Sequence, residues 1–116
     1  MAKRRTDRVP LDSTGLALST ASERIGAAAA ACLEWEEGGD PHTVTETAAI
    51  ASASASIAIE AVVSDEPWDK QLEEPTTRRG RLAYAGWLLL LAGADEGAQS
   101  CDLFQSSELF ERAASS

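Results

Sequence analysis

Apolar side chains recur with helical spacing in the first third of the chain. The steps between them alternate between three and four residues, in the order Leu18, Ala21, Ile25, Ala28, Cys32 and Trp35. This spacing places them on one side of a helix. Asp12 or Ser13 supplies an N-cap, and a capping box at Thr20 and Glu23 is a later alternative start. The two glycines at 38–39 end the helix.

A run of alanine and serine follows, AAIASASASIAIEAVV at residues 48–63. Its alternation of small and apolar residues is also that of a strand. The run is far longer than a usual strand of about five or six residues, however, and alanine is the best helix former. Asp40 and Pro41 stand before it, and this pair is a strong helix start because aspartate caps and proline fits the first turn. We therefore expect a second, slim helix that lets its neighbours approach closely.

The segment after Thr76 and Thr77 predicts a third helix that is apolar on all sides. Either threonine can cap it, and Gly93 or Gly97 ends it. From Leu82 to Leu91 the apolar side chains cover the whole helical wheel. A helix of this kind lies at the centre of a bundle or is covered by an oligomer partner.

Two shorter segments complete the expected fold. Residues 67–75 have a proline at each end and predict a loop. Asp102 and Gln105 form a capping box for a short amphipathic helix. The sequence thus predicts an all-α fold, an up-and-down antiparallel helical bundle with three long helices and a short C-terminal one.

Charge divides the chain into two parts. The net charge is −9, yet residues 1–8 hold four of the ten basic residues and one of the nineteen acids. We expect residues 1–11 to be a flexible basic arm and residues 12–116 to be a single acidic domain. A net charge of this sign excludes a generally basic nucleic-acid-binding protein.

The sequence also predicts where the chain resides. No apolar segment follows the early KRR, so no signal peptide is expected. The longest uninterrupted apolar run, residues 82–94, is too short for a membrane span of about 20 residues. We expect a cytoplasmic protein without a membrane contact, in which Cys32 and Cys101 are reduced and buried as small hydrophobes.

Two acidic pairs resemble a catalytic pattern. Glu34-x-x-Glu37 and Glu66-x-x-Asp69 are similar to the ExxE and ExxD motifs with which all-α nucleotide pyrophosphohydrolases hold Mg²⁺. The helix between the pairs would be about 36 Å long, so antiparallel packing sends them to opposite ends of the bundle. One histidine and two cysteines predict no zinc site. Since the sequence also offers no nucleophile–base pair and no cofactor motif, we expect no metal, no cofactor and no enzymatic activity.

Arginines at the start of the third helix are the most informative charges. Arg78, Arg79 and Arg81 occupy turns where the helix dipole disfavours cations. One explanation is an internal partner, such as Glu73, Glu74 or the acidic end of another helix. The other is an external phosphate, met jointly with the basic residues of the arm, Lys3, Arg4, Arg5 and Arg8.

These observations favour a small non-enzymatic protein that acts by protein–protein interaction as an assembly subunit, adaptor or inhibitor. Trp68, Glu73 and Glu74 are candidate contacts for a partner protein, and homo-oligomerisation stays open. A nucleoprotein subunit that contacts phosphates through the two basic clusters is the alternative. A Mg²⁺-dependent phosphohydrolase is a remote third.

Overall fold

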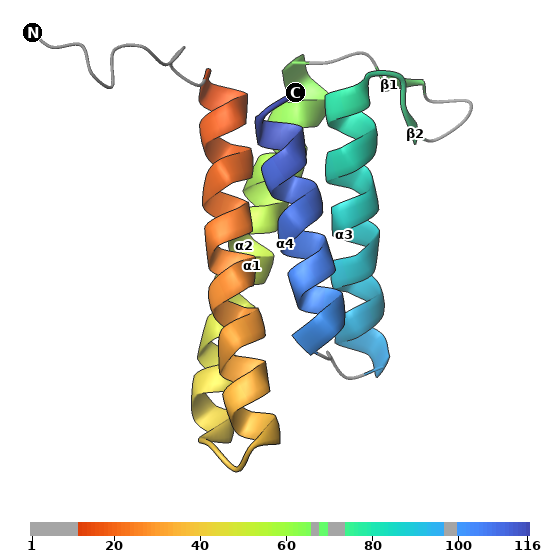
Figure 1. Ribbon diagram of the computed structural model, residues 1–116. Helices are drawn as coiled ribbons and strands as arrows, with labels where there is room; N and C mark the ends of the chain where they lie inside the picture. Colours follow the sequence, from red (N-terminus) through yellow and green to blue (C-terminus); the bar gives the residue numbers. More distant parts are fainter. Residues whose placement is uncertain (1–11, 66–67, 70–73, 97–99) are drawn as a thin grey trace, which may run out of the picture.

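Four α-helices and one pair of very short strands make up this computed structural model (Figure 1), which describes residues 12–65, 68–69, 74–96 and 100–116. The helices are α1 (Ser13–Glu36), α2 (Pro41–Asp65), α3 (Arg78–Glu96) and α4 (Ser100–Ala114). The predicted all-α class is confirmed, since the strands have two residues each.

Helix α1 begins where Asp12 caps it. The Asp12 carboxylate accepts a hydrogen bond from the Gly15 backbone N–H at 2.6 Å, as an N-cap does. The later start at Thr20 is therefore wrong. After the C-cap residue Glu37, Gly38 adopts a φ of 103°, which a residue with a Cβ rarely adopts, and the chain turns into α2.

Helix α2 runs for 25 residues through the alanine and serine segment. At its start the Asp40 carboxylate accepts a hydrogen bond from the His42 backbone N–H at 2.9 Å. The buried side of the helix consists of Ala51, Ala55, Ala58 and Val62, with steps of four, three and four residues. The helical interpretation of this segment is confirmed, and its apparent alternation is incidental.

The segment predicted to be a loop contains the two strands. Strand β1 (Trp68–Asp69) pairs antiparallel with β2 (Glu74–Pro75). Two residues are too few to show the period of a strand, which is why the sequence pattern gave no sign of them. Pro75 is buried against Gly80, where a Cβ would come within 2.5 Å of the proline Cβ.

Helix α3 begins after Thr77, whose side-chain oxygen accepts a hydrogen bond from the Gly80 N–H at 3.0 Å. It continues to Glu96, past the first glycine proposed as its end. Helix α4 begins at Ser100, two residues before the predicted cap, and buries Leu103, Phe110 and Ala113 on one face as expected.

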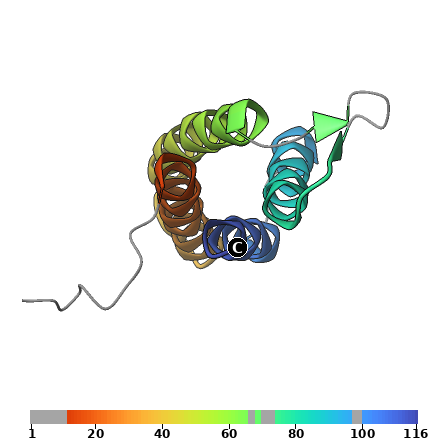
Figure 2. The same cartoon turned by 90° about the horizontal axis from the view of Figure 1, so that it is seen from above.

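Seen from above, the helices form an open ring in the order α2, α1, α4 and α3, with its opening between α2 and α3 (Figures 1 and 2). Helix α1 packs extensively against α2 and α4, and α3 packs against α4. Helices α2 and α3 make few contacts with each other. The ring is therefore weakest between these two helices.

The core is thin because small residues line most of it. Its largest fully buried apolar side chains are Phe110, Leu18, Ile25 and Val62. Much of the rest is alanine from α1 and α2. Phe110 lies directly over Gly86 of α3, where an added Cβ would meet the ring at 2.9 Å.

Enlarging a buried alanine of α2 tests this packing. Ala58 has no exposed surface, so we expect Ala58→Leu to overpack the contact with α1 and lower the free energy of unfolding by about 1–3 kcal/mol. Ala53→Leu, at an exposed position of the same helix, is the control and should change it by about 0.5 kcal/mol or less. Equal effects in chemical denaturation would place α2 outside the core.

Candidate interaction surfaces

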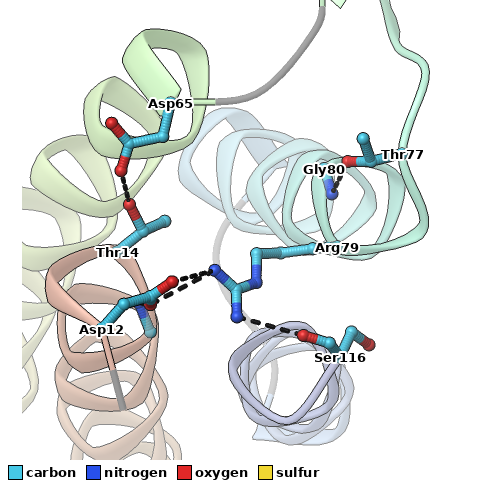
Figure 3. Close-up of polar contacts among 8 residues, drawn as sticks. Asp12, Thr14, Asp65, Thr77, Arg79, Gly80 and Ser116 are labelled. Atoms are coloured by element: carbon cyan, nitrogen blue, oxygen red, sulfur yellow. Dashed lines mark hydrogen bonds and ion pairs between the residues drawn. The ribbon is translucent and has the colours of Figure 1, made fainter.

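A polar cluster fastens one end of the bundle, and Arg79 is at its centre (Figure 3). Its guanidinium lies 3.1 Å from the Asp12 carboxylate at the start of α1 and donates to the Ser116 backbone carbonyl at 3.0 Å. The Arg79 side chain is only 17% exposed. One arginine of the predicted cluster therefore has an internal partner, which is the N-cap of another helix.

The same end carries a second link between helices. The Thr14 hydroxyl donates to the Asp65 carboxylate, which joins the first turn of α1 to the last turn of α2 (Figure 3). The Gly15 N–H, and after it the Arg79 guanidinium, hold the pKa of Asp12 below its ordinary value of 3.8. All four helices are thus tied at this end, by Thr14–Asp65 and by the two contacts of Arg79.

The other two arginines of the cluster are exposed. Arg78 lines an open polar groove of about 570 Å³ together with residues of α4 and the C-terminus, namely Glu108, Glu111, Arg112, Ser115 and Ser116. The groove has acidic and basic walls, which favours no single charge of ligand. Lys3, Arg4, Arg5 and Arg8 lie outside the described residues, so no described contact joins them to Arg78 or Arg81.

Two of the three predicted protein contacts lie in the strand pair. Trp68 belongs to β1 and Glu74 to β2, next to the start of α3 (Figure 1). Glu73 lies outside the described residues, and the side chains of Trp68 and Glu74 are not described.

The two acidic pairs do not come together. Glu34 and Glu37 are at the end of α1, whereas Asp69 follows α2 at the opposite end of the molecule (Figure 1). Glu66 lies outside the described residues. Within the described part of the chain, no three His, Cys, Asp or Glu side chains are placed to hold a metal ion.

The two cysteines differ, contrary to the expectation that both are buried. Cys32 is buried in α1, its sulfur lies 3.7 Å from the Glu36 carboxylate, and burial raises the pKa of its thiol. Cys101 is exposed near the start of α4. Of the apolar residues that follow it, Leu103 is buried but Phe104 is 47% exposed, so nearness to apolar residues in the sequence does not bury this thiol.

Helix α3 carries two apolar stripes, and α4 covers only one. Ala83, Gly86 and Leu90 are buried on its inner side. Leu88 and Leu91 are 48% and 43% exposed on another side. The predicted central position of α3 is therefore wrong within a single copy of the chain, while the other alternative, cover by a partner, stays open.

Helix α2 also exposes two of its three isoleucines. Ile50 and Ile57 are seven residues apart, hence on one face, and they are 45% and 62% exposed. By length and composition alone α2 is apolar enough to cross a membrane, and only 22% of its most apolar window is buried within the structure. The sequence predicted no such segment because its longest uninterrupted apolar run is too short. In α2 the serines separate the apolar residues, so the helix has no long uninterrupted run.

The sequence predicted the wide apolar surface of α3 and left open its cover by an oligomer partner. The exposed stripe of α2 was missed, because the whole helix was expected to be a slim part of the scaffold. Comparisons with protein-family models, with curated proteins and with solved structures find no match to this chain.

The stabilisation of the folded state by Asp12 should depend on pH. Because its pKa is lowered in the folded state, the stabilisation it provides is complete above its ordinary pKa and is lost as the pH falls through the lower, folded value. We expect Asp12→Ala to unfold at a lower temperature at neutral pH, and the difference from the wild type to shrink below about pH 3.8. Asp40→Ala, which removes the corresponding carboxylate of α2, should cause a smaller loss. Equal decreases in the unfolding temperature of the two variants would mean that the contact with Arg79 adds nothing to the stability.

Thiol reactivity should separate the two cysteines. An aromatic disulfide reagent should modify one thiol rapidly in the native protein and the second only on unfolding, because Cys32 is buried and its pKa is raised. Cys101→Ser should abolish the rapid phase. Two rapid phases in the native protein would contradict the burial of Cys32.

Proposed function

We propose that this protein is a small, non-enzymatic, acidic helical protein of the cytoplasm that acts by protein–protein interaction, as an assembly subunit, adaptor or inhibitor. Its scaffold is an up-and-down antiparallel bundle of three long helices and a short fourth. Its contacts are the apolar stripes that the bundle leaves uncovered.

The observation that carries this proposal is the distribution of side chains on α2. The positions that face α1 are mostly alanine and are fully buried, whereas Ile50 and Ile57 lie outside. Burial of an isoleucine is worth about 1.5–3 kcal/mol, so this arrangement gives up folding free energy that the same residues could supply inside. A partner that covers the isoleucines recovers that free energy as binding.

A second feature supports the same function. Single exposed apolar residues are normal on protein surfaces. When two of them lie one or two turns apart on the same face of a helix, they form a stripe that a partner helix can cover. Both α2 and α3 have such stripes, and these two helices pack only weakly against each other in the ring.

The nucleic-acid alternative has less support. It required three arginines at the start of α3, and the guanidinium of Arg79 is engaged by Asp12 and Ser116. The phosphohydrolase alternative required acidic pairs on one side of the bundle, and Glu34 and Glu37 lie at the end opposite Asp69.

Paired substitutions on α2 test the proposed function. Tagged wild-type protein is purified from the native host and its co-purifying proteins are identified by mass spectrometry. Ile50→Glu combined with Ile57→Glu should lose the specific partner, because it places two charges on the apolar stripe.

The matched control is Ala49→Glu combined with Ser56→Glu. It adds the same charge at the same spacing, one residue earlier along α2, at two exposed positions. Retention of the partner by the control alone supports the α2 stripe as the contact. Retention by both double variants would show that binding does not use this stripe, and the absence of any reproducible partner would remove the proposed function.

A further inference from the structure

The exposed leucines of α3 belong to a regular series of helix positions that begins with a base and ends with an acid. Arg81, Tyr84, Leu88, Leu91 and Asp95 follow one another at steps of three, four, three and four residues. This is the spacing of a seam that packs against another helix. Arg81 is exposed at one end, Leu88 and Leu91 are about half exposed, and Asp95 takes the last position of the series.

The charges of α3 are arranged against its own dipole. Its first turn carries arginines and its last turn ends in Asp95 and Glu96, with no acid in the first turn and no base in the last. Each such charge is unfavourable beside the helix end it occupies. An antiparallel neighbour with the same charges reverses this, since its basic start lies beside the acidic end of the first helix.

From this complementarity we infer that the occupant of the α3 stripe is a second copy of this chain, bound antiparallel to the first about a two-fold axis near Leu88. In that arrangement position 81 of each copy, a base, comes opposite position 95 of the other, an acid, and the leucines of the two stripes cover each other. A two-fold axis requires a surface that is complementary to itself, and this series of positions is apolar at its centre and opposite in charge at its two ends.

This inference rests on the proposed function, because it names the partner of one of the two apolar stripes. The stripe on α2 stays available for a different protein. The two proposals can therefore fail separately.

The experiment begins with the mass of the full-length protein in solution, measured across concentrations by sedimentation equilibrium. We expect a dimer, and Leu88→Glu should give a monomer because it places a charge at the axis. Leu16→Glu is the control: Leu16 is 57% exposed on α1, and its substitution should leave the dimer intact.

Charge exchange tests the antiparallel arrangement. Arg81→Glu alone places two acids together at each end of the dimer, and Asp95→Arg alone places two bases together. Each should weaken dimerisation by about tenfold or more, since two favourable pairs become unfavourable. An equimolar mixture of the two variants should form a heterodimer of about wild-type affinity, because both ends are again oppositely charged.

Both single charge variants remove an unfavourable charge from a helix end, so each should unfold at the wild-type temperature or above under monomeric conditions. A loss of dimer therefore cannot be attributed to unfolding. A monomeric wild type, a Leu88→Glu variant that still dimerises, or a mixture that does not recover affinity would each overturn the inference. If the wild type is monomeric while the α2 stripe still captures a partner, the proposed function stands without the dimer.

Discussion

The close approach of α1 and α2 through alanine is the constraint on which the rest of the structure depends. Ala21 and Ala28 of α1, with Ala51, Ala55 and Ala58 of α2, are almost completely buried. Small side chains let two helix axes lie near the lower limit of the usual 8–10 Å. They also leave no room in that contact for Ile50 and Ile57, which lie on another face of α2. The thin core and the apolar surface have the same cause.

An alanine contact does little to fix how two helices are oriented, because many alignments of small residues pack almost equally well. The polar links at the end of the bundle supply that information. The hydrogen bond from Thr14 to Asp65 requires one particular register of α1 against α2. The contacts of Arg79 with Asp12 and Ser116 require one particular position of α3. Hydrogen bonds are directional where dispersion is not, and a charged partner left unpaired at a half-buried site is costly. These contacts select the arrangement that the alanines permit.

Local signals in the sequence were sufficient for most helix boundaries. Aspartate before Ser13 and the Asp40–Pro41 pair acted through the backbone of their own first turns, so tertiary structure did not alter them. The fate of Arg79 depended instead on Asp12, 67 residues away in the sequence, and no local pattern indicates such a pair. Cys101 was misjudged because apolar neighbours in the sequence do not show which face of the helix is buried: Leu103 is buried, whereas Phe104 is exposed like Cys101. For α3, the sequence showed correctly that more than one face is apolar, but only the packing of α4 decided which face is left uncovered.

An acidic chain must bring its copies together against their mutual repulsion, and this limits where they can meet. A net charge of −9 opposes association over most of the surface, although salt screens this opposition beyond about 8–10 Å. The start of α3 is an exception, since it holds three of the ten basic residues of the chain within four positions. Two copies that approach through α3 bring these bases to the acidic ends of the opposite helices, while Arg79 stays engaged within its own copy. Apolar area supplies the attraction in such a contact, and the charges decide its direction.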